Sequence, residues 1–353
     1  IIDPLVLMDA FGTDALRFTL AAMAAQGRDI KLSEQRVAGY RNFITKLWNA
    51  ARFCEMNECR LDANFAPGAC KSAINRWIVS GCVEAARDVA VAIEAYRFND
   101  AANAAYHFVW HTFCDWYLEF AKPVLYGDEG AAKDETRATA AWVLDRILAI
   151  MHPITPFVTE ELSRSLGWRG DTMMSDAKWP AYDESLVDHE AKSEIDWLVR
   201  LISEVRSVRA EMNVPPGAKV PLAFADAGAD SANRFERNLT VIQTMARVEP
   251  SVAGSSESAE VRDGAIQIVF EDSSLMLKIA DFIDIAEERA RLERERGKMQ
   301  GEIDKIDKKL GNEKFLSRAP EAVVEEQRER RSEADLSCRK LDEALGRLSW
   351  LSS

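Results

Sequence analysis

The sequence predicts a mainly α-helical protein, in which a helical bundle is followed by a small α+β module and a C-terminal antiparallel coiled-coil hairpin. Through residues 1–215, apolar residues recur at helical spacing, and no strand-like alternation competes with that pattern. After Pro215-Pro216-Gly217 the apolar period changes to that of strands. In residues 286–353, sixteen Lys and Arg and sixteen Asp and Glu surround apolar residues at coiled-coil spacing. We therefore expect domains at 1–215, 216–283 and 284–353.

The first domain is predicted to be a bundle of antiparallel helices. Asp14 is expected to cap a helix that carries Leu16 and Phe18, and Ser33 is expected to cap the next one. In that second helix a buried stripe is predicted at alternating spacings of three and four, made of Val37, Tyr40, Ile44, Leu47, Ala51 and Cys54. Further helices are expected at about 71–95, 99–126, 132–150, 156–166 and 187–212, because Gly, Pro or polar loop residues separate these segments.

Residues 96–119, YRFNDAANAAYHFVWHTFCDWYLE, carry the heaviest aromatic load of the chain. Eight aromatic residues fall within about six helical turns: Tyr96, Phe98, Tyr106, Phe108, Trp110, Phe113, Trp116 and Tyr117. The pattern is typical of a core helix. We expect these rings to pack the bundle and to hold the helix at 33–57 in place, and not to form a binding platform themselves.

The α+β module is predicted from strands at Val220–Ala225, Ala265–Phe270 and Leu275–Ile279, with a helix at Arg234–Ala246 and a loop at 254–258. In the hairpin, Gly311-Asn312 stops the first helix and Pro320 starts the second. Each helix has roughly 25–30 residues, so the hairpin extends about 40 Å. Gln327 and Arg331 fall at seam positions, where polar side chains weaken a coiled coil.

Composition and charge limit the classes of function. The net charge of −13 argues against nucleic-acid binding over the whole surface, since phosphate contacts need Lys and Arg. The charge is uneven, however: residues 28–60 hold seven Lys and Arg against four Asp and Glu. No apolar run approaches the roughly 20 residues that span a bilayer. None of the six cysteines forms a CxxC pair, so we expect buried free thiols in a reducing cytoplasm.

No catalytic constellation is visible. The sequence lacks the Gly-rich phosphate loops and the GxSxG nucleophile motif. His107 and His111 have the i, i+4 spacing of a metal pair, but HFVWH lacks the glutamate of HExxH. We expect two packed or capping histidines. The prediction is therefore no catalytic residue, no metal and no cofactor in this chain.

Two surfaces have the side chains that bind unpaired RNA: cations for phosphates, amides for base edges and aromatic rings for stacking. The first lies on the helix at 33–57, where Arg41, Thr45, Trp48 and Arg52 form one row and Asn42, Lys46, Asn49 and Phe53 the next. From this helix we assign an RNA role to Arg41, Asn42, Phe43, Lys46, Asn49 and Arg52. The second is the tip of the hairpin, with Lys305, Lys308, Lys309, Asn312, Lys314, Phe315 and Arg318. The alternative is a solvated charged face in both places, with Trp48 and Phe53 turned into the bundle and Phe315 packed into the turn.

Five segments resemble the valyl-tRNA synthetase family, and together they cover essentially the whole chain. They are IDPLVLMDAFGTDALRFTLAAMAAQGRDIKLSEQRVAGYRNFITKLWNAARF (2–53), the aromatic stretch (96–119), MHPITPFVTEEL (151–162), VRAEMNVPPGAKVPL (208–222) and LGNEKFLSRAPEAVVEEQRER (310–330). The third is shared loosely with the isoleucine and leucine enzymes, and the others are more particular.

The resemblance implies that the chain is the C-terminal part of a class I aminoacyl-tRNA synthetase that joins valine to its tRNA with ATP and magnesium. It implies an anticodon-binding helical bundle with a stem-contact segment at 1–32, a linking module and a tRNA-binding arm that touches the outer corner of tRNA(Val). The HIGH and KMSKS motifs and the editing domain are absent from the sequence. We therefore expect a monomer that does not aminoacylate alone, since valine and ATP would bind the missing catalytic domain.

Two alternatives remain open at this point. One is the corresponding part of the isoleucine or leucine enzyme. The other is a protein-interaction scaffold of helices and coiled coil without an RNA role, which the acidic composition alone would favour.

Overall fold

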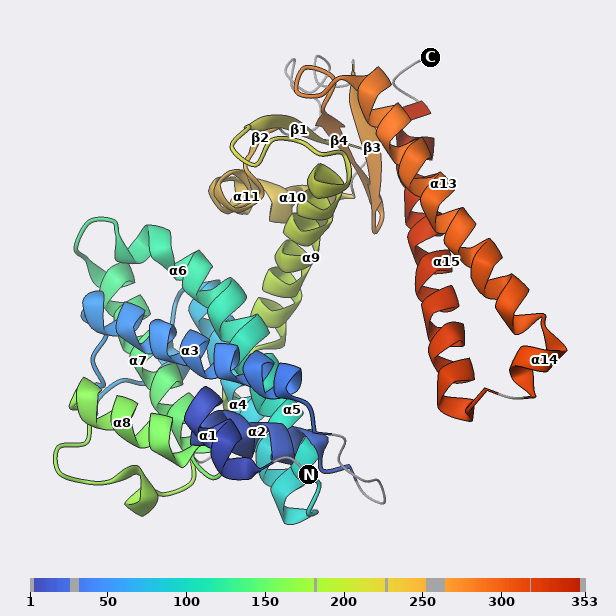
Figure 1. Cartoon of the computed structure of the whole chain (residues 1–353). Helices are drawn as coiled ribbons and strands as arrows, with labels where there is room; N and C mark the ends of the chain where they lie inside the picture. Colours follow the sequence, from blue (N-terminus) through green and yellow to red (C-terminus); the bar gives the residue numbers. More distant parts are fainter. Residues whose placement is uncertain are drawn as a thin grey trace. The chain divides into compact units, whose positions relative to one another are not determined.

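The chain forms two compact units, Ile1–Trp197 and Leu198–Ser353. The computed structural model describes residues 3–25, 32–180, 183–225, 228–251, 264–317 and 319–349, without the side chains of 314 and 322. Helices dominate, with one four-stranded sheet and a paired-helix arm among the described residues, and this confirms the predicted fold class (Figure 1). Among the described helices, none is long and apolar enough to cross a membrane. The division into three domains stays a prediction.

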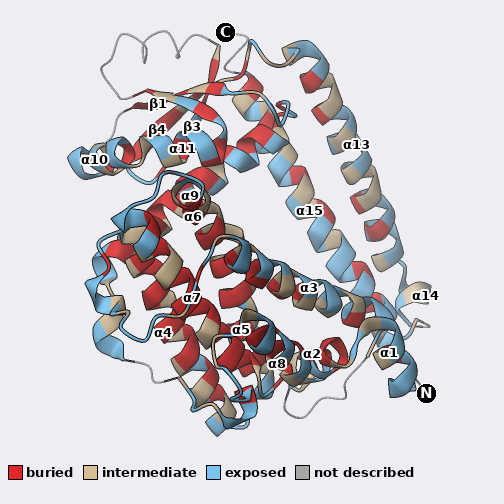
Figure 2. Ribbon diagram, turned by 90° about the vertical axis from the view of Figure 1, so that its left-hand side faces the viewer, coloured by how far each residue is buried: buried red, intermediate tan, exposed pale blue. Residues whose placement is uncertain are grey.

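The first unit is a helical bundle. Its helices are α1 (Pro4–Phe11), α2 (Thr13–Met23), α3 (Glu34–Met56), α4 (Ala73–Glu94), α5 (Phe98–Tyr106), the π-helix η2 (His107–Tyr117), α6 (Leu118–Leu125), α7 (Ala131–Met151), α8 (Pro156–Leu166) and the beginning of α9 (His189–Glu211). Short 3₁₀ turns lie at η1 (Pro67–Ala69), η3 (Met174–Asp176) and η4 (Glu184–Leu186). Buried residues concentrate on α4 and α7 (Figure 2). The predicted helices are confirmed, whereas α1 was not expected.

The cap of α3 is confirmed, and the cap of α2 is not. Ser33 accepts a hydrogen bond from the backbone N–H of Arg36. The residue before α2 is Gly12, and Asp14 lies inside the first turn of α2. The carboxylate of Asp14 instead accepts from the backbone N–H of Val158 at 2.6 Å and of Phe157 at 3.4 Å, at the start of α8. The prediction for Asp14 was wrong because these N–H groups come from a helix distant in sequence.

The aromatic stretch runs through α5, η2 and α6 without a break. Phe108, Phe113 and Tyr117 are buried, and the rings of Phe113 and Tyr117 stack at 5.7 Å between centroids. For these rings the predicted packing role is confirmed. Tyr96 lies in the turn between α4 and α5, and Phe98 is the first residue of α5. Both are exposed, so the prediction is wrong for them.

The second unit contains a mixed sheet of order β2-β1-β4-β3, made of β1 (Val220–Ala225), β2 (Val248–Ser251), β3 (Ala265–Phe270) and β4 (Ser273–Lys278). β1 and β2 are parallel, and the other pairs are antiparallel. Between β1 and β2 the chain forms α10 (Ala229–Arg237) and α11 (Leu239–Ala246), where one helix was predicted. The rings of Phe224 and Phe235 stack at 4.6 Å and fix α10 against β1. The loop predicted at 254–258 lies outside the described residues.

The arm is a hairpin of α13 (Ile285–Leu310) and α15 (Glu321–Ser349), with the single turn α14 (Glu313–Leu316) at its tip (Figure 1). Asp284 caps α13 by accepting from the backbone N–H of Glu287. At the root, the guanidinium of Arg347 contacts Glu211 at 2.6 Å, and Arg291 donates to the carbonyl of Glu211. These bonds tie both arm helices to the end of α9. The predicted hairpin is confirmed.

Candidate nucleic-acid interface

The outer face of α3 presents the predicted polar residues to solvent. Arg41, Asn42, Asn49 and Arg52 are exposed. Arg41 donates to the side-chain oxygen of Asn42 at 3.3 Å, and Arg52 forms an ion pair with Glu55 at 3.4 Å. Both arginines therefore keep donors that point to solvent, since a guanidinium carries five N–H groups.

Lys46 joins α3 to η2. Its ammonium forms an ion pair with Asp115 and lies 4.0 Å from the centroid of the Trp110 ring. Asp115 also contacts His111 at 3.4 Å. Because Asp115 neutralises the ammonium, Lys46 holds Trp110 and Asp115 in place more than it offers a free charge.

The surface of η2 beside α3 carries rings that the sequence reasoning assigned to packing. Tyr106 and Trp110 are half-buried and stack at 5.6 Å, and His107 and His111 are exposed with ring centroids 5.3 Å apart. Burial, the largest effect, raises the pKa of Tyr106. Of the predicted alternatives, packed or capping histidines, burial in the core is wrong, because the i, i+4 pair falls on the solvent side of η2. The i, i+4 repeat of rings at 106/110 and 107/111 was the signal available in the sequence.

Phe43 does not lie on this surface. Its side chain is 0% exposed and packs at 5.1 Å from Phe18 and 4.8 Å from Tyr106. The assignment of Phe43 to RNA contact is therefore wrong in this structure, since its ring has no open face. Trp48 and Phe53 are half-buried, and Phe53 packs against Tyr126, the residue that follows α6.

At the arm tip, Lys305, Lys308, Lys309 and Asn312 are exposed. Phe315 is half-buried, and its backbone N–H donates to the carbonyl of Asn312. The side chain of Lys314 and the whole of Arg318 lie outside the described residues. The structure therefore brings the first three lysines together on one helix and says nothing of the other two cations.

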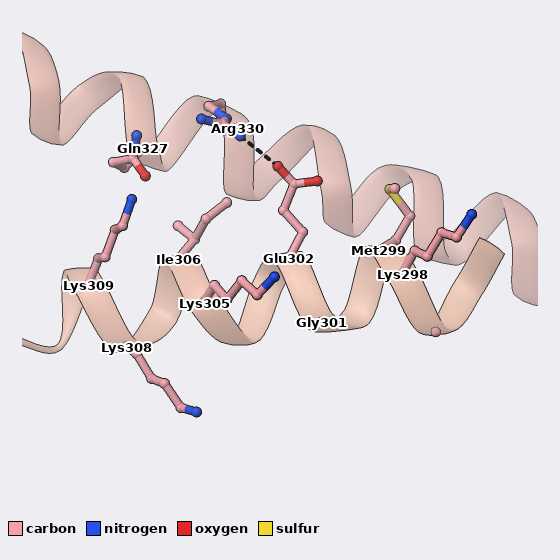
Figure 3. Close-up of a pocket in the computed structure, with 11 residues that line it drawn as sticks. Lys298, Met299, Gly301, Glu302, Lys305, Ile306, Lys308, Lys309, Gln327 and Arg330 are labelled. Atoms are coloured by element: carbon pink, nitrogen blue, oxygen red, sulfur yellow. Dashed lines mark hydrogen bonds and ion pairs between the residues drawn. The ribbon is translucent and has the colours of Figure 1, made fainter. Parts of the chain in front are cut away.

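A groove of about 810 Å³ runs between α13 and α15 below the tip. Figure 3 shows Lys309 from α13 and Gln327 from α15 pointing toward one another, while Lys308 points away from α15. Arg330 closes one side of the groove by an ion pair with Glu302 at 2.7 Å. The amide oxygen of Gln327 is buried and has no hydrogen-bond partner among the described residues.

The structure also places the groups considered for metal or redox chemistry. All six cysteines are free and buried, as predicted. In the portion of the chain that the structure describes, no group of three His, Cys, Asp or Glu side chains has the arrangement of a metal site.

Two models of known families match parts of this chain. The profile of the anticodon-binding domain of tRNA ligase matches residues 75–224, which include η2 and most of the bundle. The profile of the valyl tRNA synthetase tRNA binding arm matches residues 284–349, which include the whole hairpin. α3 precedes both matched ranges.

Curated relatives match over almost the full chain. The valine–tRNA ligases of Caulobacter vibrioides and Brucella suis are 49% and 48% identical over 99% of this chain. The chain spans 38% of the length of each. The crystal structure of the ternary complex LeuRS–tRNA–LeuAMS from Agrobacterium radiobacter K84 is 14% identical, with a TM-score of 0.43, over 76% of this chain and 28% of that one. That likeness is too low to bear on the surfaces described above.

The relatives also distinguish between the valine enzyme and the isoleucine or leucine enzyme. Each of these curated relatives is a valine–tRNA ligase, so the alternative of the isoleucine or leucine enzyme is not supported. The two profiles cover residues 75–224 and the arm. The chain belongs to the valine–tRNA ligase family, and it corresponds to the anticodon-binding domain and the tRNA-binding arm of that enzyme.

Proposed function

We propose that this chain binds tRNA(Val) through two surfaces. The α3–η2 surface, made of Arg41, Asn42, Asn49 and Arg52 with the rings of η2, contacts the anticodon stem-loop. The arm tip, made of Lys305, Lys308, Lys309, Asn312, Lys314, Phe315 and Arg318, contacts the outer corner of the tRNA. In the complete enzyme this binding serves the ATP-dependent attachment of valine, and the chain alone carries no catalytic centre.

One observation is the main support for RNA binding by the α3–η2 surface. Arg41, Asn42 and Asn49 lie in the open on α3, and the rings of His107 and His111 are exposed on η2, which Lys46 joins to α3. Cations for phosphates, amides for base edges and an aromatic face for stacking are thus combined within two adjacent segments. That combination suits an unpaired loop, whose bases are free to stack and to form hydrogen bonds.

The acidic net charge is compatible with this proposal. Debye screening limits the reach of surface charges to about 8–10 Å in physiological salt, so local cations decide a phosphate contact. The α3–η2 surface includes the cations Arg41 and Arg52. Most of the excess of Asp and Glu over Lys and Arg lies elsewhere in the chain.

The stem-loop contact is tested with Arg41→Ala combined with Arg52→Ala. We expect this double variant to bind an anticodon stem-loop of tRNA(Val) about 10-fold or more weakly, because it removes two charge-assisted hydrogen bonds at roughly 1 kcal/mol each. Fluorescence anisotropy measures the affinity.

The matched control is Arg97→Ala combined with Arg164→Ala. Arg97 forms an exposed ion pair with Asp100 at 3.3 Å, like that of Arg52 with Glu55, and Arg164 is exposed on α8. The control should bind like the wild type, and both variants should keep the melting temperature. Equal loss of affinity in both pairs would assign the effect to general charge and reject the α3 surface.

A filter-binding titration tests the scaffold alternative. The proposed function requires total tRNA to bind in preference to a random RNA of equal length. A scaffold without an RNA role would show no such preference.

A further inference from the structure

We propose that the groove between α13 and α15 binds the ribose–phosphate backbone of RNA and that Gln327 accepts a hydrogen bond from a ribose 2′-hydroxyl. The groove would thereby distinguish RNA from other polyanions. This inference rests on the proposed function of the arm and adds to it the chemical group that is recognised.

The groove is lined by lysines that form no ion pair with another described residue. Lys298, Lys305, Lys308 and Lys309 all line it, and none of them forms an ion pair with another described residue. The arginines of the arm behave differently, because Arg330 pairs with Glu302 and Arg331 pairs with Asp307, each at 2.7 Å. The arginines therefore hold the two helices together, and the lysines remain available for phosphates.

Gln327 is the unusual member of the groove. It is 7% exposed and lies on α15 between Val324 and Ala334, both of which are buried in the seam. Within the described part of the arm its amide oxygen has no hydrogen-bond partner, although the side chain reaches toward α13 and the ammonium of Lys309 (Figure 3). An apolar side chain at this position would pack the seam without leaving a polar atom unsatisfied.

The groove is open along α13, to one side of this amide. Gly297 and Gly301 line the groove and contribute no side chain, and a Cβ added at either position would meet nothing within 4 Å. Ile306 forms the apolar floor beside them. An RNA strand in the groove would contact lysines along α13 and one hydrogen-bond acceptor, the amide of Gln327, on α15.

The chemistry of these groups selects RNA among anionic ligands. Lysine ammonium groups bind any phosphate, whether from RNA, DNA or a free polyphosphate. An unpaired amide acceptor needs a donor, and the 2′-hydroxyl is the backbone donor that RNA has and DNA lacks. The combination therefore points to RNA.

The experiment compares two forms of tRNA(Val), an unmodified transcript and one with 2′-fluoro groups throughout, which keeps the phosphates and removes the hydroxyl donor. Affinities are measured for the whole chain, for Gln327→Leu and for Gln300→Leu. Gln300 is exposed on α13 and donates to Asp304, so its replacement is a matched control outside the groove. Circular dichroism confirms that each variant is folded.

For the wild type and for Gln300→Leu we expect a preference for the unmodified transcript. For Gln327→Leu we expect this preference to fall by about 5- to 10-fold, the effect of removing one hydrogen bond. An unchanged preference in folded Gln327→Leu overturns the inference.

A third variant, Lys305→Ala with Lys308→Ala and Lys309→Ala, separates the inference from the proposed function. If it weakens binding of both transcripts while Gln327→Leu changes nothing, the arm binds tRNA and only the role of Gln327 is rejected. If it leaves both affinities unchanged, the proposed function of the arm is rejected together with the inference.

Discussion

Asp14 uses its carboxylate on a helix other than its own. Thr155, the residue before α8, makes no side-chain cap, and the oxygens of Asp14 accept from Val158 and Phe157 in its place. Arg17 adds a second link from α2, since its guanidinium donates to the backbone carbonyls of Pro153 and Ile154. Two side chains of α2 therefore position the start of α8.

We predict that Asp14→Ala lowers the free energy of unfolding by about 1–2 kcal/mol, the usual cost of losing a helix cap. Asp14→Asn should cost less, because its amide oxygen still accepts from one backbone N–H. Urea denaturation followed by circular dichroism measures both. Equal stability of Asp14→Ala and the wild type would show that the carboxylate does not cap α8.

The contribution of Asp14 to stability depends on pH with a defined sign. Burial, the largest effect, raises the pKa of Asp14 above its ordinary value, although the backbone N–H groups of Val158 and Phe157 lower it. A raised folded-state pKa gives a contribution to stability that is present below the unfolded pKa and is lost as the pH rises through the folded pKa. The stability of the wild type relative to Asp14→Asn should therefore increase as the pH is lowered from neutral through that pKa. A decrease over this range, measured by urea denaturation, would contradict it.

The pKa values of the buried cysteine thiols shift in different directions. A hydrogen bond with Cys54 and, more weakly, the charge of Arg137 lower the pKa of the Cys59 thiol. Burial raises the pKa of Cys82 and of Cys114 to about 12. Cys59 also lines a cavity of about 440 Å³.

We predict that iodoacetamide at mildly alkaline pH alkylates Cys59 first in the folded chain, because the thiolate is the reactive form. Mass spectrometry of partially labelled protein identifies the site. Labelling of Cys82 or Cys114 before Cys59 would contradict the assignment. Serine at position 59 provides the control and should leave the folded chain nearly unlabelled.

Residue type alone did not decide which side chains of α3 face solvent. Arg41, Asn42, Asn49 and Arg52 are exposed as predicted, because each lies outside the stripe of buried positions. Phe43 is adjacent to the same rows, and it is buried because Phe18 and Tyr106 reach it from α2 and α5. Helical spacing shows which residues share a face, but it does not show which neighbours cover that face.

At the scale of elements, the regular strands were predictable and the irregular segments were not. β1 and β3 have the predicted bounds, since each is a short apolar run, and β1 follows the Pro-Pro-Gly break. β2 is four residues long and contains Pro250, so the sequence shows no alternation there. η2 follows an i, i+5 hydrogen-bond pattern that a search for the 3.6-residue period does not detect.

Arg209 connects α9 to the sheet. It is 6% exposed and donates to the carbonyls of Arg247, Ala218 and Pro215, which lie at the ends of the segments that lead into β1 and β2. Burial lowers the pKa of this guanidinium. This buried cation, with its three carbonyl acceptors, therefore links α9 to the sheet of the second unit.

We predict that Arg209→Met lowers the free energy of unfolding by roughly 2–3 kcal/mol, because three carbonyls lose a charged donor. Arg200→Met is the control on the same helix. Arg200 forms an exposed ion pair with Glu271, and its removal should cost under about 1 kcal/mol. Thermal unfolding measured by circular dichroism compares the stability of the two variants. Equal losses of stability would show that Arg209 does not link α9 to the sheet.

At the scale of the whole molecule, the net charge of −13 and the free lysines of the arm predict opposite responses to salt. Repulsion between an acidic protein and RNA weakens as salt is added, so a chain that met RNA only through its net charge would bind more tightly in high salt. A chain that meets phosphates through local lysines releases counterions and binds less tightly. The sign of the salt dependence therefore reports which charges touch the RNA.

We predict that tRNA affinity falls with rising salt, and that replacing Lys305, Lys308 and Lys309 by Ala reduces the slope of log K against log salt by about 2, at roughly 0.7–0.9 for each phosphate that is no longer neutralised. Filter binding over a series of salt concentrations gives the slope. Lys71→Ala with Lys178→Ala, two exposed lysines of the first unit, should lower it by much less. An unchanged slope in the arm variant would place the phosphate-binding cations elsewhere, whatever its effect on affinity at a single salt concentration.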